Sequence, residues 1–232
     1  NINNIFKGAG ITDISGLTIG SGVTSATDWI KDCPITTANN VTMKNNNTKF
    51  TGHNTLVSCT NFKITSDVTQ LSQVFKDCPK LTSFSFSDES DFSNLTRLDF
   101  TFDGASSLVS LNLSNVVCTS KLTTIDGLCC DCGGLTTLYL PSNLQDSSIK
   151  IIYQLAPNAE KLKTIYNLYL PDGFEEFGNY SLGWVGAIEP KHAIDVIGFR
   201  VPNTTNPATV FAKVYKMFKT FSNVIWPETT TS

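Results

Sequence analysis

Short apolar triplets recur along almost the whole chain, each with the form apolar-x-x-apolar-x-apolar. The nine triplets are Ile14-Leu17-Ile19, Ala38-Val41-Met43, Cys59-Phe62-Ile64, Leu81-Phe84-Phe86, Leu108-Leu111-Leu113, Leu135-Leu138-Leu140, Ile165-Leu168-Leu170, Ile194-Ile197-Phe199 and Phe221-Val224-Trp226. Their second members follow one another at 21 to 30 residues, and self-similarity at about 20–30 residues is typical of a leucine-rich solenoid. Because the second and third members lie two residues apart, they point to the same face of a strand. The pattern therefore predicts stacked repeats with one parallel strand each and a continuous core.

A second pattern lies between the triplets and ends just before each first apolar position. Its clearest copies are Phe75–Leu81, Phe102–Leu108 and Cys129–Leu135. A large apolar residue followed three positions later by a small one suits a single helical turn packed on the back of a sheet. Gly, Pro, Ser and Asp would then turn the chain into the next strand.

Two stretches carry a resemblance to a known family. Phe75–Phe86 reads Phe-x-x-Cys-x-x-Leu-x-x-Phe-x-Phe, and Cys132–Pro141 reads Cys-x-x-Leu-x-x-Leu-x-Leu-Pro. Over about residues 5–227 the chain resembles the BspA-like class of leucine-rich repeats. The resemblance implies a curved solenoid used for adhesion or protein contact, commonly in bacterial surface proteins and also in phage and protist proteins. We therefore expect a leucine-rich-repeat solenoid, a β-rich α/β horseshoe of about nine repeats with one parallel sheet and with turns and short helices on the convex side.

The repeat predicts one domain over residues 1–227, regular over 1–171 and less regular over 172–227, followed by a tail or linker at 228–232. Two longer helices are expected, at Gln145–Leu155 and at Ala208–Phe221, the second after the N-terminal signal Asn206-Pro207. The last strand is expected at Val224–Trp226. Because the chain begins without a Met or a secretory signal, we expect a piece of a longer product. Because a solenoid needs polar caps over its terminal turns and the last expected strand ends six residues before residue 232, we also expect an adjoining domain or subunit to cover a solenoid end.

Composition limits the partners. Charged residues make up 16% of the chain, against roughly 25% in ordinary globular proteins. The net charge of −3 and the pI near 5.3 provide no basic field for nucleic acid. No run of about 18 apolar residues occurs, so we expect no membrane insertion.

The seven cysteines fit the repeat rather than a disulfide framework. Five of them take slots where other repeats carry a hydrophobic residue or alanine; for example, Cys78 and Cys132 correspond to Ala105 and Ala159. We expect these five to be small buried apolar residues, whereas Cys118 and Cys130 have no counterpart.

Candidate chemistry is sparse. The cluster Cys129–Cys132 lacks the second pair of ligands that a zinc site normally needs. The two histidines, His53 and His192, do not form a metalloprotease motif, and no phosphate-binding loop or nucleophile elbow occurs. We expect no enzyme activity, no metal and no cofactor.

The outward side of the predicted concave sheet is the better place for a ligand. Its middle column is expected to contain Thr18, Thr42, Lys63, Ser85, Asn112, Tyr139, Tyr169, Gly198 and Ile225. Tyr139 and Tyr169 would lie on adjacent strands, flanked by Asn112, Asn167 and Arg200, a composition typical of binding hot spots. The alternative is a cross-strand aromatic pair that supports the sheet. The Asn-rich stretch Asn39–Asn47 is a second candidate site, or a solvated loop.

Three functions follow from these observations. The first is a non-catalytic adhesion or binding module of a microbial surface protein, located at the cell surface or outside the cell, that recognises a protein or a glycan. The second is a structural or receptor-binding component of a virion, such as a phage tail or decoration protein, which reduced core cysteines would suit. The third is an intracellular protein-interaction scaffold.

Overall fold

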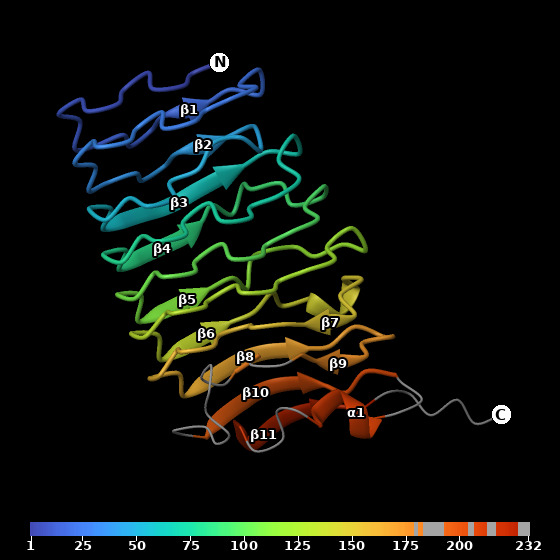
Figure 1. Cartoon of the computed structure of the whole chain (residues 1–232). Helices are drawn as coiled ribbons and strands as arrows, with labels where there is room; N and C mark the ends of the chain where they lie inside the picture. Colours follow the sequence, from blue (N-terminus) through green and yellow to red (C-terminus); the bar gives the residue numbers. More distant parts are fainter. Residues whose placement is uncertain (179–180, 183–192, 204–206, 213–216, 227–232) are drawn as a thin grey trace.

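The computed structural model describes residues 1–178, 181–182, 193–203, 207–212 and 217–226. The chain is a parallel β-solenoid of about 7 turns with almost no helix. Figure 1 shows the turns stacked in chain order from the N-terminus to the C-terminus. The predicted stacking of repeats is confirmed. The predicted leucine-rich-repeat horseshoe of about nine repeats, with one parallel sheet and with helices on its convex side, is wrong.

Most strands lie along one side of the stack and pair in parallel. The first sheet contains, in order, β1 (Thr18–Ile19), β2 (Thr42–Met43), β3 (Ser58–Ile64) and β4 (Ser83–Phe86). The second continues with β5 (Ser110–Asn112), β6 (Thr137–Tyr139), β8 (Thr164–Tyr169), β10 (Ile194–Arg200) and β11 (Phe218–Ile225). On the other side of the stack β7 (Ile151–Ile152) pairs with β9 (Glu176–Phe177), as Figure 1 shows.

Most turns bend at two left-handed residues placed four positions apart. We call each such five-residue stretch a corner segment; the paired positions with positive φ are Asn4 and Gly8, Asp28 and Asp32, Gln73 and Asp77, Phe100 and Gly104, Gly127 and Asp131, and Gln154 and Asn158. Gly, Asn and Asp dominate these positions because they tolerate left-handed backbone better than other residues. The corner segments form ladders: the amide of Phe75 donates to the carbonyl oxygen of Thr101 in the next turn, at 2.9 Å.

This geometry explains why the predicted helical turn on the back of the sheet is wrong. A helical turn would need right-handed residues throughout 73–77, but φ is +61° at Gln73 and +56° at Asp77. Alternate backbone amides, those of Gln73, Phe75 and Asp77, therefore bond to the neighbouring turn, whereas the two amides between them bond within their own turn. The apolar residue and the small residue three positions later still point inward, since Phe75 and Cys78 are both buried.

The two longer predicted helices are also wrong. Residues 145–155 contain the end of a 3₁₀ turn, η1 (Leu144–Asp146), and then β7. Within 208–221 the helix α1 (Pro207–Phe211) is short, and β11 begins at Phe218 rather than at 224. Stacking against the preceding turn overrides the helical spacing of the apolar residues here, because β11 pairs along most of its length with β10. The predicted N-cap at 206 and the tail at 228–232 lie outside the described residues.

The core is one continuous column of apolar side chains between the ladders. Phe50, Phe75 and Phe102 occupy equivalent positions in successive turns and stack almost parallel, with ring centroids 5.3 and 5.7 Å apart. All seven cysteines are free and buried. Three of them share one role: the thiols of Cys33, Cys78 and Cys132 each donate to a carbonyl oxygen of the preceding turn, at 2.8, 3.2 and 3.1 Å respectively. No helix in the described part of the chain has the length and apolar character that crossing a bilayer requires.

Candidate functional site

The predicted tyrosine site lies on the outward side of the second sheet, but a different tyrosine fills it. Tyr139 on β6 pairs with Tyr166 on β8 rather than with Tyr169. The two rings stack with centroids 4.3 Å apart and planes 8° apart, and both side chains are partly exposed. Asn112 on β5 pairs with Tyr139 on the other side, as expected. The outward surface at this point is a ladder of Asn112, Tyr139 and Tyr166.

Tyr169 forms a separate group with Arg200, its partner on β10. The hydroxyl of Tyr169 lies against Gly198, where an added Cβ would come within 2.7 Å of the oxygen. The guanidinium of Arg200 donates to the carbonyl oxygen of Leu170 and to the carboxylate of Asp172, both at 2.8 Å. Arg200 is thus held by the adjoining loop and does not flank Tyr139.

The shift in register has a local cause at Asn167. This residue is left-handed, with φ +62°, and its side-chain amide donates to the carbonyl oxygen of Leu140 at 3.1 Å. A left-handed residue inside a strand takes up an extra position, as in a β-bulge. Alignment of the two triplets places Leu138 opposite Leu168, whereas in the structure Leu138 pairs with Ile165. Tyr169 is misplaced as a result. Whether any of these side chains binds a ligand stays a prediction.

A second left-handed residue shifts the register of the eighth triplet in the same way. Gly198 is left-handed with φ +78°, and Val196 and Phe199 are the residues that align with Ile165 and Leu168. The sequence alignment placed Ile197 in the core, whereas it is partly exposed.

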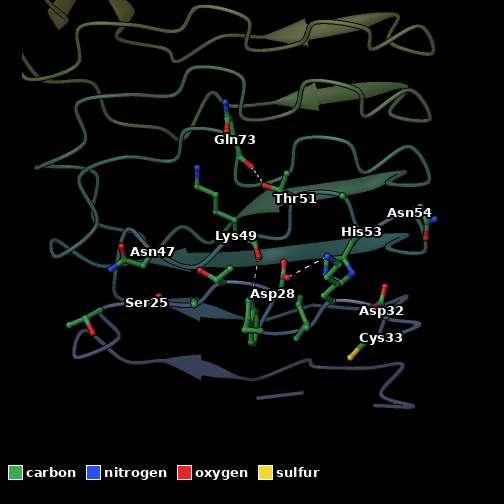
Figure 2. Close-up of a pocket in the computed structure, with 17 residues that line it drawn as sticks. Ser25, Asp28, Asp32, Cys33, Asn47, Lys49, Thr51, His53, Asn54 and Gln73 are labelled. Carbon is green, nitrogen blue, oxygen red and sulfur yellow. Dashed lines mark hydrogen bonds and ion pairs between the residues drawn. The ribbon is translucent and has the colours of Figure 1, made fainter. Parts of the chain in front are cut away.

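A second candidate is a crevice in the corner-segment ladder, between residues 24–33 and 47–54. Its volume is about 680 Å³, within the range of about 300–1,000 Å³ of small-ligand pockets. Figure 2 shows the carboxylates of Asp28 and Asp32 on one wall, with Lys49 and Thr51 on the other. Trp29 also lines the crevice, and its indole Nε1 donates to the carbonyl oxygen of Lys49 at 3.0 Å.

The crevice opens because residues 48–52 depart from the corner-segment pattern. Gly52 has the left-handed φ of +78°, but Thr48, four positions earlier, lacks the positive φ of its counterparts. A β-branched residue disfavours that conformation. Instead the amide and hydroxyl of Thr48 both donate to the side-chain oxygen of Asn45, at 3.0 Å each. The segment enters the corner along a different path and does not pair with residues 28–32.

Two unusual side chains line this opening. His53 occupies the inward slot that is filled by Ala or Cys after every other corner segment, and Lys49 takes the place of Val74 in the next turn. His53 is 9% exposed, and its burial lowers the pKa of the imidazole against an opposing effect of Asp32. Burial likewise lowers the pKa of the Lys49 ammonium, opposed by Asp99. Both groups are therefore easier to neutralise than their exposed equivalents.

The Asn-rich stretch, residues 39–47, connects turns rather than forming a solvated loop. The side-chain oxygen of Asn39 accepts bonds from the hydroxyls of Ser58 and Thr60, at 2.8 and 2.9 Å. Asn46 bonds to both the amide and the hydroxyl of Thr69, at 2.8 and 2.9 Å. These amides replace backbone pairing where the turns change direction.

The arrangement of these residues gives little support for a metal or cofactor site. Among the described residues, no group of three or more His, Cys, Asp or Glu side chains is placed to hold a metal ion. Burial raises the pKa of the Cys78 and Cys118 thiols to about 12. These thiols stay protonated near neutral pH, the form in which a thiol is a poor nucleophile and a poor metal ligand.

Sequence reasoning missed the crevice entirely. A usable signal exists, since Thr48 and His53 break a pattern that every other corner segment keeps. The signal becomes visible only after the corner segments are aligned by their left-handed residues.

Comparison with known proteins identifies no family: no family model, no curated protein and no solved structure matches the chain.

Proposed function

We propose that the chain is a non-catalytic binding module of a microbial surface protein, and that it recognises a protein partner on the sheet face around Tyr139 and Tyr166. The observation that carries the proposal is the stacked, partly exposed tyrosine pair. Tyrosine is enriched at protein interfaces because it buries a large ring while its hydroxyl forms hydrogen bonds. Thr137 and Thr164, which pair in the same ladder two residues before the tyrosines, are also uncharged.

The orientation of the rings favours a protein over a glycan. Each tyrosine covers one face of the other, and Ile197 follows Tyr166 in register on β10. A sugar stacks on a free ring face, whereas this ladder presents ring edges and hydroxyl groups outward. Edges and hydroxyls suit hydrogen bonds to a polypeptide surface.

The state of the thiols supports a role without catalysis. All seven cysteines are buried and unpaired, and burial raises the pKa values of Cys59, Cys78, Cys118, Cys129 and Cys130. A nucleophilic thiol needs a lowered pKa and an accessible sulfur.

The apolar end of the solenoid supports an adjoining domain or subunit. On the last strand, Phe221 is 41% exposed and Ile225 51%, and the next residue, Trp226, is 72% exposed. Contiguous exposed apolar side chains of this size typically mark contact surfaces.

The test is saturable binding of the purified chain to an array of host and extracellular-matrix proteins. The double variant Tyr139→Ala/Tyr166→Ala should weaken binding to any captured protein about tenfold or more, with an unchanged circular dichroism spectrum. Tyr153→Ala is the matched control, because Tyr153 is an exposed tyrosine that packs over Gly178, away from this ladder. Equal affinities of the double variant and the wild type would refute the site.

A virion component is the second candidate, and the free cysteines favour it. Seven unpaired thiols suit a chain that folds in a reducing compartment, where disulfides rarely form. Sedimentation of the native material separates the two proposals: the chain would be recovered with particles in one case and with the cell envelope in the other.

A further inference from the structure

The crevice interrupts the most regular hydrogen-bond ladder of the molecule. In the corner segments 4–8, 73–77, 100–104 and 127–131, the amides of the two left-handed residues and of the residue midway between them donate to the next turn. Phe100, Phe102 and Gly104, for example, donate to carbonyl oxygens of the next turn at 2.8, 3.0 and 2.8 Å. The equivalent amides at the crevice belong to Asp28, Ile30 and Asp32, and none of them has a hydrogen-bond partner among the described residues.

The opposite wall carries the matching acceptors. By the same alignment, the carbonyl oxygens that should receive these bonds are those of Asn47, Lys49 and Thr51. The carbonyl of Lys49 is bonded to the Trp29 indole, while those of Asn47 and Thr51 receive no hydrogen bond from the part of the chain that the structure describes. One wall thus carries backbone amides at alternate residues, and the other wall carries backbone carbonyls at alternate residues. An added strand can bond to both sets, as it does at the edge of a sheet.

Burial makes this unpaired state costly. Ile30 is 1% exposed, so its amide has little access to bulk water. A buried amide without a partner is rare in folded proteins and is energetically unfavourable. Pairing it with a ligand carbonyl recovers that free energy on binding.

The charges around the opening are balanced. Asp28 and Lys31 form an ion pair at 3.4 Å, and Asp32 and Lys49 add one charge of each sign. The crevice therefore selects neither a strongly acidic nor a strongly basic ligand.

We propose that the crevice binds an extended, weakly charged peptide segment, whose carbonyls accept from the amides of Asp28, Ile30 and Asp32 and whose amides donate to the carbonyls of Asn47 and Thr51. The wall bends at two left-handed residues four positions apart, and a segment that follows it must bend in the same places. The preferred ligand therefore has Gly, Asn or Asp at two positions four residues apart. This site is independent of the tyrosine ladder and does not rest on its function.

The experiment is selection of displayed linear peptides of about 10 residues on the intact chain, followed by amide NMR titration with one synthesised binder. Selected sequences should carry Gly, Asn or Asp at a spacing of four. The binder should shift and protect the amides of Asp28, Ile30 and Asp32. The corresponding amides of Gln73, Phe75 and Asp77, already paired to the next turn, are the internal control and should not respond.

A variant that blocks the crevice provides the second part of the experiment. Thr51 is exposed at the rim, and Thr51→Trp should fill the opening and weaken binding about tenfold or more. Lys7→Trp places the same bulk at the equivalent exposed position of the first turn and should bind as the wild type does. The proposal is overturned if no peptide binds below about 1 mM, if binding is unaffected by Thr51→Trp, or if the amide shifts fall outside the crevice.

Discussion

Replacing Phe75 with alanine should destabilise the middle of the solenoid by about 5 kcal/mol. The ring is fully buried, and it contacts the rings of Phe50, Phe62, Phe84 and Phe102 at centroid distances of 5.3, 5.3, 5.0 and 5.7 Å. Truncating a core Phe to Ala costs about 3–5 kcal/mol, and each aromatic pair adds about 0.5–1.5 kcal/mol beyond its buried area. Four ring contacts place this variant at the upper end of that range.

Phe92→Ala is the matched control. Phe92 is also buried but has one aromatic neighbour among the described residues, Phe86 at 5.2 Å. We expect it to cost about 3 kcal/mol. The difference of about 2 kcal/mol corresponds to roughly a 30-fold difference in the equilibrium constant for local opening.

Hydrogen exchange followed by mass spectrometry is the appropriate assay, because repeat arrays do not always unfold in one step. In Phe75→Ala, exchange should accelerate in peptides covering residues 50–102 and much less in those covering 149–177, since each turn contacts only its neighbours. Equal costs for the two variants, or uniform acceleration along the chain, would refute the reasoning.

Three further predictions concern the corners, the charges and the thiols. Asp77→Val should lower the free energy of unfolding by about 1–2 kcal/mol, because φ is +56° there, while Asp77→Asn should change it little in the same denaturant titration. Burial raises the pKa of Asp126, so its charged form is disfavoured in the fold. Asp126→Asn should therefore stabilise the protein at pH 7, with the gain disappearing as pH falls below the carboxyl pKa of the unfolded chain, about 3.9; a pH-independent gain would contradict this. All seven cysteines are buried, so a thiol reagent should label none of them within minutes in the native state and all of them in denaturant.

The stacked architecture could be predicted from sequence because one signal dominates it. Inward residues two apart, such as Leu138 and Leu140, recur once per turn, and both are fully buried. The burial of the equivalent residues Cys78 and Ala105 could also be predicted from the sequence, since a small inward residue follows each corner segment.

The corner segments were misread because two structures share one apolar pattern. A large inward residue and a small one three positions later, such as Phe75 and Cys78, fit either a helical turn or a bent segment with left-handed ends. Spacing of apolar residues cannot separate them. The distinguishing signal is polar: Gly, Asn or Asp recurs at the end of these segments, where a helix would have no need of it.

An aromatic pair on the outward side of the sheet was predicted from the sequence, but in the wrong register, and its role as a binding site stays a prediction. A single left-handed residue, Asn167, moves the pairing from Tyr169 to Tyr166. Asn is common in this sequence, so composition alone does not reveal which copy bulges a strand. The crevice was missed for the converse reason, since it arises where Thr48 lacks the expected bend.

The measurement that tests the solenoid most directly is the scalar coupling transmitted through the hydrogen bond of the Phe75 amide. The account predicts a coupling from the Phe75 nitrogen to the carbonyl carbon of Thr101, in the next turn, across a bond of 2.9 Å. A helical turn on the back of a horseshoe would instead couple Phe75 to the carbonyl of Leu71, four residues earlier. Coupling to Leu71 would contradict the solenoid, and with it the ladder that the crevice interrupts.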